Sequence, residues 1–167
     1  MSHIKHAQPD HPIQAALQQR WSPYAFDGRP VSDADLQSVL EAARWAPSAF
    51  NEQPWRFVLA RRQDDAAFER ALSCLVEANR AWAQHAGALL LSVVATQFQR
   101  NGKDNRCAEH DLGLAVGNLV TEATARGLHV HQMAGIDMDR VHATYQVPDG
   151  FRAVTAIALG YAKPLDQ

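Results

Sequence analysis

A helix should end and a strand should begin within W-A-P-S-A-F-N-E-Q-P-W-R-F, residues 45–57 of the chain. Residues 32–46 place apolar side chains at helical spacing. Pro47 ends this helix, because a proline disfavours the helical conformation in the residue before it. Pro54 opens residues 55–60, whose aromatic and branched side chains suit a buried strand. The chain therefore turns sharply between the two elements.

The turn after this helix is polar and is flanked by rings. Ser48, Asn51 and Gln53 can each donate and accept hydrogen bonds, and Trp45, Phe50 and Trp55 flank them. Two interpretations fit these residues alone. In one, Ser48 and Asn51 satisfy the backbone of an ordinary helix–strand corner. In the other, the polar groups and rings form a place where a flat polar ligand binds.

The corner resembles a known motif. Residues 46–55, A-P-S-A-F-N-E-Q-P-W, match without mismatch the A-P-S-x-x-N-x-Q-P-W signature of the nitroreductase family of flavin mononucleotide (FMN) enzymes. Residues 20–26, R-W-S-P-Y-A-F, are similar to that family's phosphate-binding R-x-S-x-(R/K)-x-F segment, except at Tyr24. Further pieces follow in the family's order, namely D-L-G at 111–113, N-L at 118–119, G-L at 127–128, M-A-G at 133–135 and A-L-G-Y at 158–161. The ordered set carries the resemblance.

This resemblance implies an α+β fold, a nitroreductase-like three-layer sandwich with a mixed, mainly antiparallel central sheet and helices on both faces. It also implies a homodimer in which each of two sites takes residues from both chains. We expect residues 11–167 to form a single nitroreductase-like domain. Residues 1–10 are polar and lack the apolar core of a secretory signal, so we expect a flexible N-terminal arm.

The resemblance also implies which residues bind the cofactor. Arg20 and Ser22 would hold phosphate and ribityl oxygens, and Pro47, Ser48 and Asn51 of the partner chain would border the ring. Residues 133–135 would lie near the other ring edge, and Lys163 is a weak candidate for the phosphate. The complete implied set is Arg20, Trp21, Ser22, Tyr24, Pro47, Ser48, Ala49, Asn51, Gln53, Met133, Ala134, Gly135 and Lys163.

The implied activity is a ping-pong oxidoreduction at the dimer interface. A hydride would pass from NADH or NADPH through flavin N5 to a small electrophilic acceptor such as a nitroaromatic or a quinone, with no dedicated catalytic side chain. Tyr24 replaces a cation of the family motif, so we expect Arg106 or Lys103 to neutralise the reduced flavin, or a lowered flavin potential. The alternatives are a flavin-binding carrier or sensor without turnover, a specialised family member with a lid, for which only residues 97–105 leave room, and a small dimer without cofactor.

Composition excludes several other classes of protein. The 167 residues carry a formal net charge of −2 with acids and bases interspersed, so we expect neither nucleic acid nor a membrane surface as partner. The longest apolar run, residues 86–95, is about half of the ~20 residues that a membrane helix needs. Cys74 and Cys107 have no paired spacing, which indicates free thiols, no disulfide and a reducing, cytoplasmic location.

The remaining elements follow from periodicity and caps. A first helix is expected over residues 11–19 with Ile13, Ala16 and Leu17 facing inward. Ser32 and Asp35 are placed as a capping box for the helix before the corner, and Asp137 as the cap of a helix that runs to Tyr145. The other expected elements are a helix at 64–79, a strand at 87–94, a loop at 97–105, a helix at 106–126, a short strand from 129 and a strand at 153–161.

Two features of the later helix and strand leave alternatives open. Gly113, Gly117 and Thr121 give the 106–126 helix a second, small face, which could pack on the chain's own sheet or at a dimer interface. His129 and His131 point to the same side of the short strand, but no third ligand has a supporting spacing. We therefore expect ordinary polar histidines and no metal site.

Overall fold

The computed structural model describes residues 5–164, so the expectations for residues 1–4 of the arm and for 165–167 lie outside the described residues. Within this range the chain forms six α-helices, one short 3-10 helix and four strands. In order they are α1 (Ala15–Gln19), α2 (Asp33–Arg44), η1 (Ala49–Asn51), β1 (Trp55–Arg61), α3 (Asp65–Leu72), α4 (Glu77–Ala83), β2 (Ala88–Ala95), α5 (Ala108–Ala125), β3 (His129–Met133), α6 (Met138–Tyr145) and β4 (Phe151–Gly160).

The four strands form one sheet in the order β1-β2-β4-β3. Every pairing between these strands is antiparallel. The predicted α+β sandwich is therefore confirmed, whereas the parallel pairing implied by a mixed sheet is not seen between the strands of residues 5–164. The two central strands are β2 and β4, and β2, which lies in the longest apolar run of the sequence, is buried at every position.

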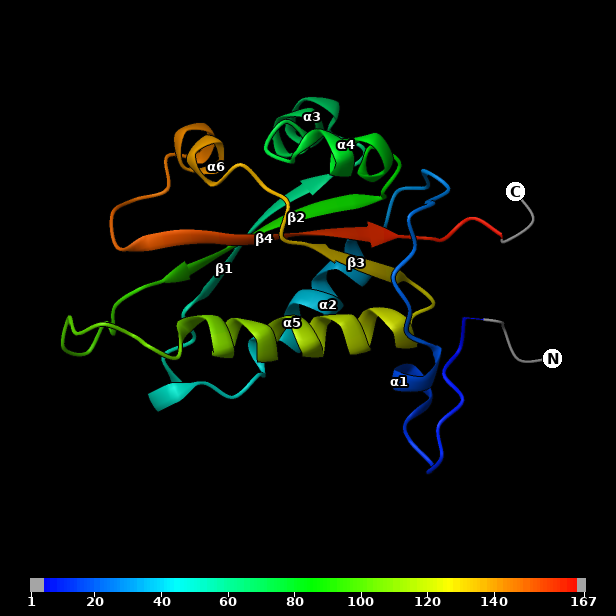
Figure 1. Cartoon of the computed structure of the whole chain (residues 1–167), viewed down its shortest axis with the longest axis horizontal. Helices are drawn as coiled ribbons and strands as arrows, with labels where there is room; N and C mark the ends of the chain where they lie inside the picture. The colour runs from blue at the N-terminus through cyan, green and yellow to red at the C-terminus, as the bar shows by residue number, and fades with distance from the viewer. Residues whose placement is uncertain (1–4, 165–167) are drawn as a thin grey trace.

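Helices cover both faces of the sheet (Figure 1). One layer contains α2 and α5, and the opposite layer contains α3, α4 and α6. Alternate side chains of the strands enter the two cores, because successive strand residues point to opposite faces. Leu90 and Ile157 belong to the core beneath α2 and α5, while Leu89 and Ala158 belong to the core beneath α3, α4 and α6.

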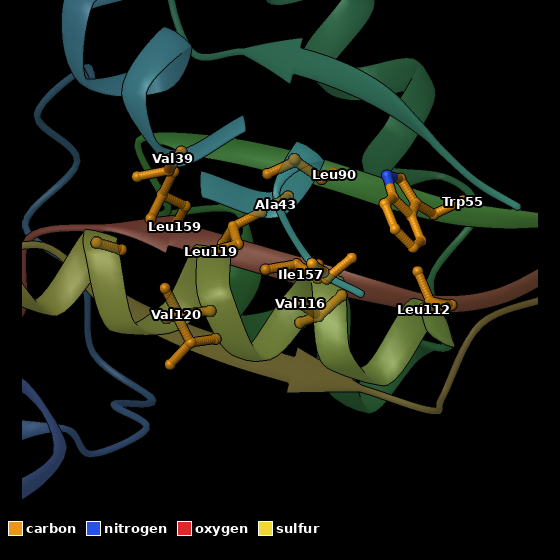
Figure 2. Close-up of a cluster of buried hydrophobic side chains, with 14 of the residues drawn as sticks. Val39, Ala43, Trp55, Leu90, Leu112, Val116, Leu119, Val120, Ile157 and Leu159 are labelled. Carbon is orange, nitrogen blue, oxygen red and sulfur yellow. The ribbon is translucent and has the colours of Figure 1, made fainter. Parts of the chain in front are cut away.

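The core beneath α5 fixes the position of the corner that follows α2. Figure 2 shows Val116 and Leu119 of α5 pointing toward Ile157 of the sheet, with Trp55 above Leu112 near the start of α5. Trp55 opens β1 directly after the corner and is 8% exposed. Burying aromatic and aliphatic side chains such as these stabilises the folded state by roughly 25 cal/mol for each Å² of apolar surface removed from water. The corner is thus attached at both ends to well-packed elements.

The first helix is shorter than expected, and its apolar side chains do not face inward. The predicted helix over residues 11–19 begins only at Ala15, and it buries none of its residues. Ile13 is 46% exposed and Leu17 is 49% exposed, so the prediction that they face the core of their own chain is wrong. A segment that buries no face lacks the tertiary packing that stabilises most short helices.

The predicted helix over residues 64–79 is also wrong, because it is divided into α3 and α4. The backbone of the intervening residues bonds to the loop after β3 instead of continuing a helix. Asp137 N donates to Cys74 O at 2.8 Å, and Val76 N donates to Gly135 O at 3.1 Å. Leu75 and Ile136 form an isolated β-bridge between these bonds. Tertiary hydrogen bonds therefore outweigh a helical pattern that was continuous along the sequence.

Helix caps agree closely with the sequence. Asp35 N donates to Ser32 Oγ at 3.1 Å, as the capping box predicted. The hydrogen bond from the Ser32 hydroxyl, together with that from Arg126, holds the pKa of Asp35 below its usual value. Asp137 accepts from Arg140 N at 2.9 Å and caps α6. The Arg126–Asp35 ion pair, at 3.2 Å, joins the start of α2 to the end of α5.

Candidate functional site

A buried carboxylate that is distant in sequence holds the corner between α2 and β1 in place. Asp111, in the first turns of α5 and only 2% exposed, accepts a hydrogen bond from Ala49 N at 2.9 Å. A charge removed from water needs such partners, since an unpaired buried carboxylate is strongly unfavourable. Asp111 is a residue of the site that sequence reasoning did not select. Its signal was an acidic residue on the apolar stripe of a helix, beside Leu112 and four residues before Ala115.

The corner's own polar side chains divide into two groups. Ser48 Oγ accepts from Gln53 N at 3.0 Å, and the Gln53 amide donates to Arg44 O at 3.4 Å. Ser48 therefore satisfies the backbone, as the interpretation as an ordinary helix–strand corner predicted, and so does Gln53, which that interpretation did not name. Pro47 and Asn51 are exposed, and Ala49 is half-buried. The Ser48 proton and the exposed Asn51 amide are thus the groups that the corner can still offer to a ligand.

The corner also has an unusual backbone. Phe50, Asn51 and Gln53 adopt φ values of +56°, +55° and +49°. Positive φ is uncommon for residues other than glycine, and for a bulky side chain such as phenylalanine it is unfavourable. Such conformations persist where the surrounding structure imposes them, and they concentrate at functional sites. The backbone strain favours the second interpretation of the corner, as a ligand site.

Residues 20–28, here called the Arg20 loop, lie against the end of β4. Asp27 N donates to Tyr161 O and Lys163 N donates to Ala25 O, each at 3.0 Å. This pairing brings Lys163 to the same loop as Ser22, although more than a hundred residues separate them in sequence. The Arg20 guanidinium donates to Ser22 Oγ at 3.3 Å. Three of the predicted phosphate-binding residues therefore come together.

A hollow of about 420 Å³ opens beside this loop. Its lining consists of Lys5, Trp21, Ser22, Tyr24, Ala25, Lys163 and Pro164. The lining contains ammonium and hydroxyl groups, which bind phosphate oxygens through charge-assisted hydrogen bonds. The donor set therefore suits the phosphate end of the cofactor that the sequence resemblance implies.

His131 and Trp82 contact the Arg20 loop through a hydrogen bond and ring packing, and neither role was predicted from the sequence. His131 Nδ1 lies 2.9 Å from Pro23 O. Because a carbonyl can only accept, Nδ1 carries the proton in this bond. The Tyr24 ring meets His131 and Trp82 edge to face, with centroids 4.7 Å and 5.2 Å apart. The placement of His131 on β3 could be predicted, but its partner 108 residues away could not.

Residues 133–135 lie at the end of β3, against α4. Met133 is buried, and Ala134 is exposed. Gly135 O accepts from Asn79 Nδ2 at 3.0 Å, and a Cβ at Gly135 would lie 2.5 Å from that nitrogen. Within one chain the close approach at this glycine is thus made by α4. Among the three predicted ring-edge residues, Ala134 is the one that a ligand could reach freely.

In a single chain the two halves of the predicted site do not meet. The corner is tied to the start of α5, while Trp21 packs edge to face on His129, just beyond its end, with ring centroids 5.2 Å apart. A helix of 18 residues spans about 27 Å. Figure 1 shows the corner and α1 near opposite ends of α5, on its side away from the sheet.

The face of α5 between the two halves is uncovered. A Cβ added at Gly113 or Gly117 would meet nothing within 4 Å among the described residues. Packing on the chain's own sheet therefore does not explain these glycines. Exposed apolar side chains accompany this face and the elements at its ends, namely Ile13, Leu17, Trp45, Phe50 and Leu114. A large exposed apolar set of this kind marks an interaction surface.

Other kinds of site find little support in residues 5–164. Their His, Cys, Asp and Glu side chains nowhere gather in a group of three or more suited to a metal ion. Over the same residues no helix has the length and apolar character needed to span a bilayer. Cys74 is buried and Cys107 is exposed, and both are free thiols.

Comparison with known proteins adds independent observations. A family model described as the nitroreductase family matches residues 17–161. The chain is 39% identical over 115 residues to a Mycolicibacterium smegmatis protein described as uncharacterized. This alignment covers 64% of this chain and 74% of the relative. It is 30% identical over 151 residues to a Ralstonia nicotianae protein provisionally named NADH dehydrogenase/NAD(P)H nitroreductase, over 79% of this chain and 76% of the relative.

A solved structure is similar over nearly the whole chain. A crystal structure described as that of an oxidoreductase containing FMN aligns with a TM-score of 0.89 and 35% identity. The alignment covers 98% of this chain and 84% of that one. The fold described above is therefore also found in an experimentally determined structure.

Proposed function

The chain belongs to the nitroreductase family, and on that premise we propose that it is an FMN-dependent oxidoreductase using NADH or NADPH to reduce a small electrophilic acceptor. When bound, FMN supplies the redox chemistry, because N5 of its ring can accept a hydride from a nicotinamide and return it to an oxidant. The protein's task is to bind and orient the reactants and to exclude water.

The observation that carries this proposal is the separation of the two half-sites by the uncovered face of α5. If two copies pack through these faces about a two-fold axis, the corner of one copy approaches the Arg20 loop of the other. Two equivalent sites then form, and each takes residues from both chains. The open space at Gly113 and Gly117 supports close packing of the two α5 helices.

In this arrangement the Arg20 loop binds the anionic end of the cofactor. Arg20 and Lys163 supply charge, and the Ser22 hydroxyl supplies a further donor. The Arg20 guanidinium donates to the hydroxyl of Ser22, which lines the hollow, so the structure holds it beside that hydroxyl before the ligand arrives. Trp21 and Tyr24 form the apolar part of the lining, so the loop can pack against the chain of carbons that follows the phosphate.

The partner's corner borders the ring. Ser48 and Asn51 can hydrogen-bond to the polar edge of a flat heterocycle, with Pro47, Ala49 and Gln53 completing the border. Asp111 fixes this edge through Ala49 N, so few degrees of freedom need to be lost on binding. Met133, Ala134 and Gly135 remain candidates for the opposite edge, with Ala134 the most accessible.

The position of Tyr24 in the family motif leaves the reduced flavin without its usual cation. Lys103 lies in the 97–105 loop, which bonds to the corner through Gln99 and Glu52, and Arg106 directly follows this loop. In the two-chain site they belong to the subunit whose corner borders the ring. We propose that one of them neutralises the negative charge.

The test is the spectrum of the purified protein followed by anaerobic titration with each nicotinamide. We expect a yellow protein whose visible flavin absorbance is lost on adding NADH or NADPH and is restored by a nitroaromatic or a quinone. A yellow protein that neither nicotinamide bleaches would favour a carrier or sensor. A colourless protein that also fails to bind added FMN would contradict the proposal.

A further inference from the structure

Three side chains beside the corner form a mixed aromatic and cationic surface, here called the Phe50 platform, which consists of Phe50, Phe98 and Arg100. The Arg100 guanidinium lies 3.8 Å from the centroid of the Phe50 ring and 5.9 Å from that of Phe98. The two rings meet edge to face with centroids 5.7 Å apart. Residues from the corner and from the 97–105 loop thus form one surface.

The loop that carries Phe98 and Arg100 is an ordered hairpin. Gln97 and Asp104 form an isolated antiparallel bridge, and Phe98 N donates to Lys103 O at 2.8 Å. Gln99 N donates to the carboxylate of Glu52, which attaches the loop to the corner. The Phe50 platform is therefore built before any ligand binds.

The corner holds Phe50 outward against two opposing tendencies. Phe50 keeps 69% of its surface exposed, although a large apolar ring gains by burial. Its backbone is also in the left-handed region, which a residue with a bulky side chain adopts at a cost. A strained, exposed ring directly before Asn51, one of the residues proposed to border the flavin, indicates contact with a ligand.

Arg100 remains able to bind an anion. Stacking uses the face of the guanidinium and leaves its N–H donors available in the plane. Among residues 5–164 Arg100 forms no salt bridge, whereas Arg29, Arg61 and Arg126 each pair with an acid. Residues 97–106 also contain Lys103 and Arg106 against a single acid, Asp104, so the segment has a net positive charge.

We propose that the Phe50 platform selects the electron acceptor, and that the preferred class is planar aromatic or quinoid molecules that carry a carboxylate or a similar anionic group. The acceptor ring would pack near Phe50 while Arg100 binds the anionic substituent. This inference rests on the proposed function, since it assigns the substrate class of the same site.

The experiment compares two acceptors of similar size that differ in charge, para-nitrobenzoate and para-nitrobenzamide, in steady-state assays with NADH and the FMN-loaded enzyme. The wild-type protein should show the higher kcat/KM for the anion. Arg100→Gln should lower kcat/KM for para-nitrobenzoate by about tenfold, the size expected for one hydrogen bond to a charged group. The value for para-nitrobenzamide should change less than about twofold.

Matched variants separate local recognition from net charge. Arg70→Gln, on α3 in the opposite layer, removes the same charge and should leave both acceptors unaffected. Phe50→Leu should weaken both acceptors, because it removes the stacking surface and keeps Arg100. The preference for the anion in the wild-type protein should also decline as salt is raised, since the platform is exposed.

Several outcomes would overturn the inference. One is an equal effect of Arg100→Gln on both acceptors, and another is no effect on either. A third is a decrease in kcat/KM for NADH that matches the decrease for para-nitrobenzoate, because that result would assign Arg100 to the donor's phosphates. A failure of the proposed function is distinguishable, because the wild-type protein would then reduce neither acceptor and NADH would not bleach it.

Discussion

The two regions that we propose as half-sites lie at the two ends of α5 and are constructed in different ways. At its start, the corner is a strained backbone held by one buried carboxylate, Asp111, with few exposed polar groups. At its end, the Arg20 loop has an ordinary backbone, is bonded to the end of β4 and is supported by the ring of His131. The first arrangement provides fixed geometry, and the second provides charge around a hollow. A ligand with a rigid ring and a flexible phosphate arm needs both kinds of site.

The largest effect should come from separating the two half-sites. Gly117→Leu fills the open face of α5 with a bulky side chain, so we expect loss of the dimer and of FMN together while the subunit stays folded, because nothing described lies within 4 Å. Sedimentation or light scattering, with flavin content and circular dichroism, measures this. A Gly117→Leu protein that remains dimeric and yellow would contradict the proposed interface.

The matched control for that prediction is Gly117→Ala, which separates the two explanations of the glycine. In an isolated subunit, alanine should stabilise the helix by about 0.5–1 kcal/mol, since glycine lowers helix propensity. At a tight interface the same methyl group should instead weaken the dimer. Thermal unfolding at several protein concentrations distinguishes these results, because only dimer stability depends on concentration.

A smaller effect is expected when the rigid half-site loses its carboxylate. Asp111→Ala leaves Ala49 N without its partner, which should cost about 2 kcal/mol in the free energy of unfolding. FMN binding should fall with it, because the corner no longer has a fixed geometry. Denaturant titration and flavin binding measure the two quantities, and Glu109→Ala, an exposed acid on the same helix, is the control.

Unchanged flavin affinity in a folded Asp111→Ala protein would show that the corner does not depend on this contact. The rigidity of the corner would then not be what distinguishes it from the charged half-site in binding the flavin.

His131→Phe tests the charged half-site and should have a still smaller effect. The variant keeps a ring against Tyr24 and Trp82 but loses the hydrogen bond to Pro23 O, worth about 1 kcal/mol or roughly fivefold in affinity. Because we propose that the loop contacts the phosphate, FMN affinity should fall while riboflavin affinity stays constant. Equal losses for both ligands, or none, would assign His131 a purely structural role.

The smallest effect concerns the flavin's charge. Tyr24→Lys restores the cation of the family motif at a side chain that is 67% exposed, so solvent screens most of the interaction. We expect the midpoint potential of bound FMN to rise by about 10 mV, which corresponds to ~0.5 kcal/mol for a two-electron couple. Spectroelectrochemistry measures this potential, and the absence of an upward shift would count against the assignment of Tyr24 to that position.

Local patterns in the sequence predicted those parts of the molecule whose causes are local. Ser32 and Asp137 are caps in the structure because a cap requires only residues within one helical turn. The helix at residues 32–46, the strand after Pro54 and the apolar strand β2 were likewise predicted with small errors at their ends. The motif residues 46–55 indicated the correct family for the same reason, since they are contiguous.

The errors arise where distant segments compete with a local pattern. Residues 64–79 have helical spacing, but the backbone of Cys74 and Val76 bonds to the loop at 135–137. Ile13 and Leu17 have the spacing of a buried face, but the packing of residues 5–164 leaves them 46% and 49% exposed. Periodicity shows which side chains favour burial and does not show which surface buries them.

By itself, the sequence determined the class of fold, the family, the strained corner's location and the residue types that suit a phosphate and a flat ring. Only the tertiary structure decided that Asp111 holds the corner, that Lys163 joins Ser22, that His131 supports Pro23 and that Gly113 and Gly117 face open space. The physical reason is that propensity, capping and periodicity act over a few residues. Contacts across 62 or 108 positions depend on how the whole chain packs.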